Sequence, residues 1–270
     1  MNSRFKRLFA GKKTGPPDTR ELAPSFAYKG LSDLGLQRSV NEDCFGVFPE
    51  DYLPPYGAHG QLFVVADGMG GLLSGKRASE MAVKTVHEVY FGGQDGAVGR
   101  NLQHGFEEAN SRIYKMAVDQ DLDHKMGTTC SALILTEDRG YVSHVGDSRI
   151  YHIQQGKIRQ LTEDHTEIAE LVRHDMLSRS DAANHPRRSV LSRALGIEEK
   201  VDVDLLQDIA LERGDRFVLC TDGLSKATPE EIKDIVINST PGEACQSLVK
   251  LAYKRGAGDN ITVLVVQILL

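Results

Sequence analysis

Residues 129–161 read TCSALILTEDRGYVSHVGDSRIYHIQQGKIRQL, and this stretch decides the fold class. Four apolar runs alternate here with links of three or four residues, at 129–135, 140–145, 149–154 and 158–161. Links this short favour antiparallel pairing, because parallel strands need crossovers of roughly a dozen residues or more. The stretch therefore predicts a series of antiparallel strands.

The segments on either side add further strands and four helices. Runs at 44–48 and 62–66 flank a proline-rich loop and predict a long-tipped hairpin, and 261–268 predicts a last strand. Apolar residues at steps of three and four predict helices over 78–89 and 98–116. Thr228-Pro229-Glu230-Glu231 and Thr240-Pro241-Gly242-Glu243 each fit an N-cap followed by proline and a capping glutamate. The pattern indicates an α+β sandwich with one core.

Acidic residues stand at the ends of the predicted strands. Asp67, Asp147 and Asp222 each follow an apolar run, whereas Asp43 and Asp259 stand just before one. In an antiparallel sheet the end of one strand lies beside the start of its neighbour. We therefore expect these acids to meet at one rim, where adjacent glycines allow close approach of the backbone. The alternative is a set of separate turn and cap aspartates.

So many carboxylates in one place repel each other and hold protons unless cations neutralise them. Oxygen ligands without His or Cys select hard ions, so Mg²⁺ or Mn²⁺ is expected rather than Zn²⁺. Two such ions, roughly 3.5–4 Å apart, suit in-line displacement at phosphorus.

Composition excludes several other classes of protein. The 270 residues carry 32 basic and 38 acidic side chains, a balance that argues against nucleic acid as the main partner. The apolar runs are too short to span a bilayer. Four scattered cysteines without metal-ligand spacing predict reduced thiols in a cytoplasmic protein. Residues 1–24 hold six basic and two acidic side chains and predict a flexible tail, with membrane or partner docking as the alternative.

Six motifs stand in the order found in metal-dependent serine/threonine phosphatases of type 2C. They are Arg38-Ser39-Val40-Asn41-Glu42-Asp43, Asp67-Gly68-Met69-Gly70-Gly71, Met126-Gly127-Thr128-Thr129, Val145-Gly146-Asp147-Ser148-Arg149, Thr221-Asp222-Gly223-Leu224 and Gly258-Asp259-Asn260. From about residue 26 onward the chain resembles the bacterial single-domain members. The resemblance implies a four-layer α-β-β-α sandwich of two antiparallel sheets, with a catalytic domain over 25–270 and a variable flap at about 162–198.

The resemblance also implies a ligand set for two Mn²⁺ or Mg²⁺ ions. Asp67 would bridge both ions, the carbonyl of Gly68 and the side chain of Glu42 would complete one, and Asp222 with Asp259 would complete the other.

Three further roles follow from the resemblance. Asp43 would orient the attacking water, and Asp147 would join Asp222 at a third, weaker metal site. Arg38 would clamp the phosphoryl group, because its fork of donors fits two oxygens at once. No phosphoenzyme is needed, so no nucleophilic Ser or Cys is assigned.

The sequence departs from its relatives at two points. Met69 stands where eukaryotic members carry a histidine regarded as general acid, so that role is unassigned; His165 and His144 are candidates, with structural roles as the alternative. Gly75-Lys76 stands where bacterial members usually have Gly-Glu. In the flap, the basic residues of His185-Pro186-Arg187-Arg188 and Arg193 are candidates to meet a phosphorylated segment, or form a solvated face.

The expected function is metal-dependent hydrolysis of phosphoserine and phosphothreonine in proteins, with a role in signal transduction. The substrates would be products of a serine/threonine kinase, and the enzyme would act as a monomer. One rival is a catalytically weak, phosphoprotein-binding member of the same fold. Another is a P-loop at 70–76, which matches GxxxxGK, although Arg77 replaces the hydroxyl that should hold Mg²⁺.

Overall fold

A computed structural model describes residues 26–49, 59–71, 73–93, 97–121, 126–182 and 185–269. The predicted tail at 1–24 and the tip of the loop between the first hairpin strands lie outside these residues. None of the helices in the described part of the chain is long and apolar enough to cross a membrane.

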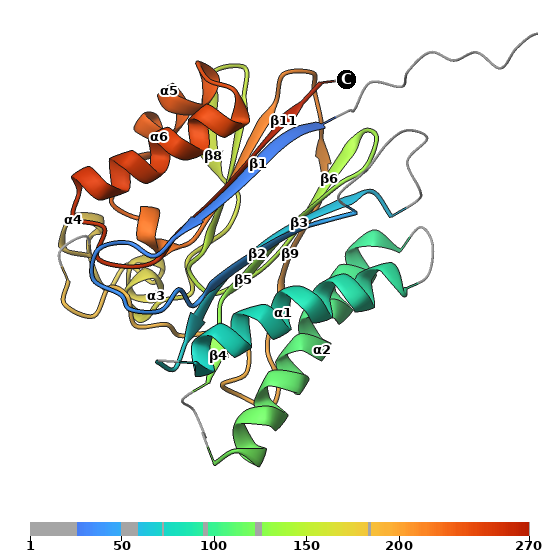
Figure 1. Cartoon of the computed structure of the whole chain (residues 1–270), viewed down its shortest axis with the longest axis vertical. Helices are drawn as coiled ribbons and strands as arrows, with labels where there is room; N and C mark the ends of the chain where they lie inside the picture. The colour runs from blue at the N-terminus through green and yellow to red at the C-terminus, as the bar shows by residue number, and fades with distance from the viewer. Residues whose placement is uncertain are drawn as a thin grey trace, which may run out of the picture.

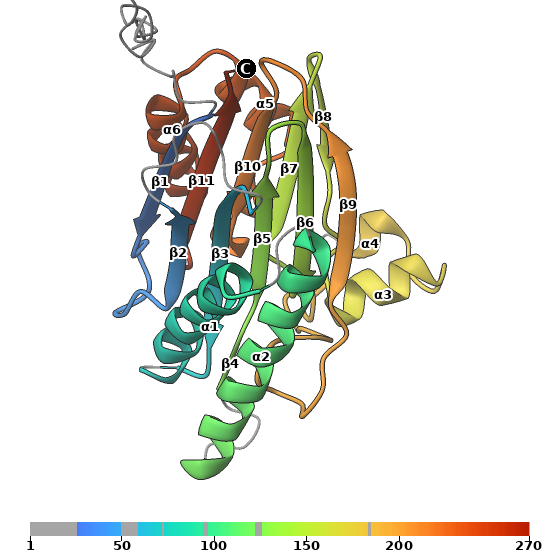
Figure 2. The same ribbon diagram turned by 90° about the vertical axis from the view of Figure 1, so that its right-hand side faces the viewer.

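Two antiparallel sheets form the centre of the molecule (Figure 1, Figure 2). The first, here called the α1-side sheet, has the order β2 (Asp43–Phe48), β3 (Gln61–Met69), β5 (Cys130–Leu135), β6 (Arg139–Val145) and β9 (Asp204–Ala210), with β4 (Gly127–Thr128) paired to the end of β3. The second, the α6-side sheet, has the order β1 (Phe26–Asp33), β11 (Ile261–Ile268), β10 (Arg216–Cys220), β7 (Arg149–Gln154) and β8 (Lys157–Gln160).

Helices cover the outer face of each sheet. The α1-side sheet is covered by α1 (Ser74–Phe91) and α2 (Val98–Asp119), and the α6-side sheet by α5 (Pro229–Ile237) and α6 (Pro241–Lys254) (Figure 1). Both late helices begin with the predicted capping box. The four layers confirm the α-β-β-α sandwich.

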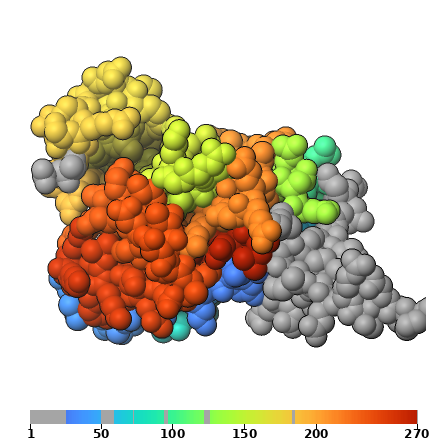
Figure 3. Space-filling view, turned by 90° about the horizontal axis from the view of Figure 1, so that it is seen from above, coloured from blue at the N-terminus to red at the C-terminus, as the bar shows by residue number. Residues whose placement is uncertain are grey.

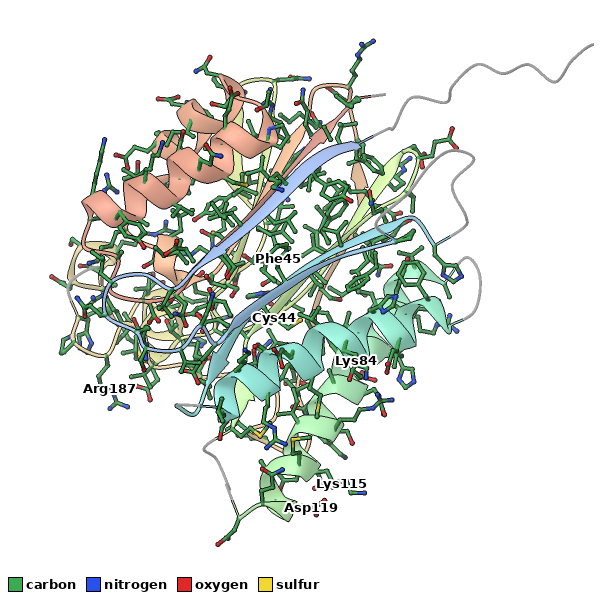
Figure 4. The ribbon with its side chains drawn as sticks, in the orientation of Figure 1. Cys44, Phe45, Lys84, Lys115, Asp119 and Arg187 are labelled. Carbon is green, nitrogen blue, oxygen red and sulfur yellow. The ribbon has the colours of Figure 1, made fainter. Side chains whose placement is uncertain are left out.

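Apolar side chains fill all three spaces between the layers. Phe63, Leu219 and Leu264 belong to the cluster between the two sheets, while separate clusters lie beneath α1 with α2 and beneath α5 with α6. The alternation is visible on β2, where Cys44 packs toward α1 and the next residue, Phe45, toward the other sheet (Figure 4). Successive strand residues point to opposite faces, so each sheet residue is committed to one of these layers.

The predicted flap, at about 162–198, is irregular apart from two short helices. It contains α3 (Glu167–Arg173) and α4 (Arg179–Ala182), both at one end of the sandwich (Figure 2). A 3-10 helix, η1 (Asp222–Leu224), follows β10 at the same end.

The structure corrects three expectations about the strands. The run at 140–145 does not pair with the run at 149–154, because β6 and β7 lie in different sheets and the intervening link crosses from one to the other. Gly146 in this link has a φ of 109°, a conformation that suits glycine. β3 continues through Asp67 to Met69 instead of ending at residue 66. The edge strands β1 and β9 were not predicted, since their burial does not alternate clearly.

Candidate active site

The predicted acidic residues lie at one rim of the sandwich, at the end that carries the flap. Two elements of the α1-side sheet contribute, the start of β2 and the end of β3. The α6-side sheet contributes η1 and the loop before β11. The link between β6 and β7 adds Asp147.

Asp43 and Asp67 stand directly opposite each other on β2 and β3. Oδ2 of Asp43 accepts hydrogen bonds from the hydroxyls of Thr221 at 2.8 Å and Thr262 at 2.7 Å. Its other oxygen, Oδ1, is buried and has no hydrogen-bond partner. Burial raises the pKa of Asp43 to about 7 despite the two hydroxyls, and the charge of Asp222 adds to the effect.

Asp67 is the central carboxylate of the group. Burial raises its pKa well above the ordinary value, and the charges of Asp43, Asp222 and Asp147 raise it further. The side chains of Asp67 and Asp222 share a hydrogen bond, and burial raises the pKa of Asp222 as well. The backbone of Asp67 is held on both sides by Thr129, whose hydroxyl accepts from the Asp67 N–H at 2.9 Å and whose N–H donates to the Asp67 carbonyl at 2.9 Å.

Glu42 and Gly68 meet where β3 contacts the start of α1. The Gly68 N–H donates to the Glu42 carbonyl at 3.1 Å, and the Gly75 N–H donates to the Glu42 side chain. A Cβ on Gly75 would lie 2.4 Å from Oε1 of Glu42, so only glycine allows this approach. Glu42 is 7% exposed, and burial raises the pKa of its carboxyl.

Asp147, Asp259 and Arg38 complete the predicted set. Burial raises the pKa of Asp147 to about 7, and the charge of Asp222 contributes. Nη2 of Arg38 lies 2.7 Å from Oδ2 of Asp259, and this hydrogen bond raises the pKa of the guanidinium. The structure thus brings all eight predicted site residues to the same rim.

Three carboxylate oxygens of this rim indicate whether the site suits bound cations. Oε1 of Glu42, Oδ1 of Asp43 and Oδ1 of Asp222 are buried without any hydrogen-bond partner. A buried polar oxygen without a partner is costly, and a divalent cation is a partner that oxygen-only ligands suit. In the present arrangement of the side chains, the described residues contain no group of three His, Cys, Asp or Glu that could hold a metal ion. Two other oxygens of the rim already have partners, since Oδ2 of Asp259 pairs with Arg38 and Oδ2 of Asp43 accepts from two threonine hydroxyls.

Sequence reasoning missed the residues that position these carboxylates. Thr221 and Thr262 were assigned no role, and neither was Asn260. The Asn260 side chain accepts from the Glu42 N–H at 2.9 Å and donates to the carbonyls of Leu34 and Val40. It therefore holds the segment that leads into Glu42. The available signal was position, because Thr221 and Asn260 each adjoin a predicted acidic ligand.

Neither histidine candidate faces the rim as a free acid. Both rings are buried, and all four ring nitrogens have partners. Nδ1 of His165 accepts from the Gly146 N–H at 3.0 Å, so its proton is on Nε2, which donates to Asp204. Nε2 of His144 donates to the Glu163 carbonyl, and Nδ1 faces the hydroxyl of Ser131 at 2.8 Å. These contacts give both histidines structural roles, and the general acid stays unassigned.

The P-loop alternative does not fit the structure. The two strands on either side of β3, which are β2 and β5, both pair with it in the antiparallel direction. A P-loop, in contrast, belongs to a parallel βαβ unit. Gly75 serves the contact with Glu42 and Gly68. Lys76 extends from α1 toward Glu80, with Nζ 3.9 Å from Oε1, so the departure at Gly75-Lys76 leaves the carboxylates in place.

A two-sheet sandwich with a rim of buried carboxylates and one arginine is an arrangement suited to a hydrolase that acts on phosphate esters. The comparisons with known proteins are specific: the chain belongs to the protein phosphatase 2C family, whose model matches residues 49–249. It is 37% identical over 242 residues to the serine/threonine phosphatase stp of Listeria innocua, covering 87% of this chain and 93% of that protein. The resemblance inferred from the six motifs is therefore confirmed.

Solved structures agree with this assignment. The serine/threonine phosphatase PstP/Ppp of Mycobacterium tuberculosis superimposes with a TM-score of 0.80 at 30% identity, covering 91% of this chain and 99% of that one. The catalytic domain of PstP, described in complex with two manganese ions, gives a TM-score of 0.76 at 28% identity, with the same coverage.

Proposed function

We propose that this protein is a metal-dependent phosphatase that hydrolyses phosphoserine and phosphothreonine in other proteins. The observation that carries the proposal is the trio of buried, unpartnered oxygens on Glu42, Asp43 and Asp222 at one rim. Membership of the protein phosphatase 2C family and the two manganese ions of the PstP catalytic domain support it. Every acidic position of the motifs is filled, which argues against a non-catalytic binding protein.

The proposed ligands for two Mn²⁺ or Mg²⁺ ions are the residues of this rim. Asp67 would hold both ions, Glu42 and the Gly68 carbonyl one, and Asp222 with Asp259 the other. Asp147 would join Asp222 at a third, weaker site. When bound, such ions supply Lewis acidity at phosphorus and make water acidic enough to react at neutral pH.

The chain's own residues then bind the substrate and orient the attacking water. Arg38 uses only Nη2 in its contact with Asp259 among the described residues, which leaves Nη1 and Nε to bind phosphoryl oxygens. The two threonine hydroxyls hold Oδ2 of Asp43, so Oδ1 is free to accept a hydrogen bond from the attacking water and to orient it. Rigid support of this kind lowers the barrier because the reacting groups need no reorganisation.

The cellular setting is also proposed. Cys44, Cys130, Cys220 and Cys245 are free thiols, as is typical of proteins from reducing compartments, which supports a cytoplasmic location. Substrates with phosphoserine or phosphothreonine require a serine/threonine kinase, so a role in signal transduction follows. Within the described residues, the exposed large apolar side chains come from different elements, for example Leu36 before β2 and Met176 in the flap, which supports a monomer. Residues 25–270 would form the catalytic domain, with 162–198 as its flap.

The test uses purified protein, p-nitrophenyl phosphate and a phosphothreonine peptide. With Mn²⁺ both are hydrolysed, and Asp67→Asn lowers kcat/KM by about 100-fold or more, because it removes a charge that acts on the reacting centre. Asp119→Asn is the control, since Asp119 is exposed at the C-terminal end of α2 and is not one of the residues of the rim (Figure 4). Calorimetry measures Mn²⁺ binding without turnover, and Asp67→Asn weakens it. Activity that survives EDTA, or persists in Asp67→Asn, would falsify the proposal.

A further inference from the structure

A cleft of about 630 Å³ opens beside the carboxylate rim. Its lining includes three carboxylates of the rim, Asp147, Asp222 and Asp259. One wall comes from the segment after η1 and the turn after α6, including Lys226 and Arg255, and the opposite wall from the flap, including Arg188. Figure 3 shows the flap (yellow) next to the α5–α6 layer (red-orange) at one end of the molecule.

The cationic side chains of this cleft differ in whether they are already neutralised. Arg149 forms a two-nitrogen ion pair with Asp164, and Arg255 pairs with Glu231. Lys226 and Arg188 have no carboxylate partner within the described residues. Both are exposed.

Lys226 is held in a defined place although it is exposed. Its Nζ donates to the carbonyl of Arg255 at 3.1 Å, and the Arg255 guanidinium donates to the Lys226 carbonyl. The ammonium group therefore lies against the carboxyl end of α6, whose carbonyl dipoles favour a cation. An ammonium group has three donors, so two remain for a ligand.

We propose that this cleft binds acidic side chains of the phosphoprotein substrate that flank the phosphorylated residue, with Lys226 as the main contact. The inference rests on the proposed function and specifies its substrate class. A polypeptide whose phosphoresidue lies at the carboxylate rim has this open cleft beside it, and an acidic side chain there meets an unpaired cation. The chain's formal charge of −6 makes such a cationic position stand out from its surroundings.

A second cleft, of about 410 Å³, lies beside Met69, and none of the cations that line it is both unpaired and held in place. Its arginine, Arg193, pairs with Asp204 at 2.7 Å, and its lysine, Lys200, is exposed and has no hydrogen bond within the described residues to fix its ammonium group. Lys226, by contrast, is held in place by its hydrogen bond to the Arg255 carbonyl, so we assign acid selection to the cleft with Lys226.

The experiment compares phosphothreonine peptides that differ only in three flanking residues. One pair has aspartates or asparagines on the amino side of the phosphothreonine, and the other pair has them on the carboxyl side. The readout is the ratio of kcat/KM for the acidic peptide to that for the neutral one, in Mn²⁺. Wild type prefers the acidic peptide of at least one pair by about two- to fivefold, as expected for one exposed ion pair. The preference lies in KM and declines as salt is added.

The variants then assign the preference to one side chain. Lys226→Gln brings the ratio close to one, and Lys226→Glu inverts it. Lys157→Gln is the matched control, because Lys157 is an exposed lysine at the start of β8 and lies outside the cleft; it keeps the wild-type ratio. A wild-type ratio near one for both pairs overturns the proposal, as does a ratio that Lys226→Glu leaves unchanged. In either case, hydrolysis of the neutral peptide shows that the proposed phosphatase function still holds.

Discussion

The carboxylates of the rim are in an environment that opposes their charge. Asp43 and Asp147 have their pKa values raised to about 7, and burial is the main cause for both. A carboxyl group whose pKa is higher in the folded than in the unfolded state lowers the free energy of unfolding as pH rises. The reason is that folding must then either bury its charge or take up a proton. Perturbed groups of this kind gather at functional sites, where stability is given up for reactivity.

His144 makes the opposite contribution, and this yields a pH prediction. Burial, together with a smaller contribution from the neighbouring His165, lowers its pKa to about 4. Since the unfolded histidine titrates near 6.5, the unfolded state binds more protons between pH 6.5 and 4, and stability falls as pH falls through this window. At about 1.36 kcal/mol per pKa unit the full effect is roughly 3 kcal/mol.

The check is urea unfolding of wild type and His144→Gln between pH 7 and 4.5. The variant is less stable at pH 7, because Ser131 and the Glu163 carbonyl lose partners. The gap between the two proteins narrows as pH falls, since glutamine does not titrate. A gap that stays constant with pH contradicts the role given to His144.

At the scale of elements, the contact between β3 and α1 controls the position of Glu42. A Cβ on Gly75 would meet the backbone of Gly68 at 2.7 Å and Oε1 of Glu42 at 2.4 Å. We predict that Gly75→Ala costs about 1–3 kcal/mol of stability, as overpacking does, and weakens Mn²⁺ binding.

Gly242→Ala is the matched control for this variant. Gly242 is also helical, and the nearest atom to its Cβ would be a side-chain carbon of Lys29 at 4.0 Å. Alanine favours a helix, so this control keeps or raises stability. Chemical denaturation and calorimetry with Mn²⁺ measure both effects, and equal behaviour of the two variants would contradict the prediction.

The capping boxes of α5 and α6 give a second element-scale prediction. The Thr240 hydroxyl accepts from the Glu243 N–H, and the Glu243 side chain accepts from the Thr240 N–H. Thr240→Ala is expected to cost about 1 kcal/mol in urea unfolding, because α6 loses its N-cap partner. Thr240→Ser keeps a hydroxyl and should stay close to wild type. Neither substitution changes kcat, since this end of α6 is remote from the rim.

At the scale of the whole molecule, the site joins the two sheets. Asp43 belongs to the α1-side sheet, whereas the hydroxyls that hold it belong to Thr262 in β11 of the α6-side sheet and to Thr221, which directly follows β10 of that sheet. The proposed ligands are divided in the same way, with Asp67 on one sheet and Asp222 and Asp259 beside the other. Binding of cations would therefore link the two halves of the sandwich.

Metal is thus expected to stabilise the fold as well as to support catalysis. Mn²⁺ at about 100 times its Kd should raise the free energy of unfolding by about 2.7 kcal/mol, and EDTA should remove this gain. Thermal unfolding followed by circular dichroism measures the shift in Tm. In Asp67→Asn the shift is small, whereas Asp119→Asn retains it. A full shift in Asp67→Asn would mean that Mn²⁺ stabilises the protein from another site.

How far the sequence predicted the fold depended on periodicity. α1, α2 and β11 have regular apolar spacing, and their bounds were close to those predicted. The edge strands β1 and β9 were missed because a strand with one pairing neighbour and partial exposure has no clear alternation. The separation of β6 from β7 was also missed, since a three-residue link between strands looks the same in sequence whether they pair or change sheets.

The sequence by itself determined the fold class, the capped helices and the acidic positions at strand ends, because these depend on local periodicity and on residue type. The tertiary structure alone decided which oxygens of those acids have partners. Thr221, Thr262 and Asn260 hold Asp43 and the segment before Glu42 through contacts between residues about 180 to 220 positions apart, and such contacts leave no local pattern. The pKa shifts have the same origin, because burial depends on how the two sheets pack.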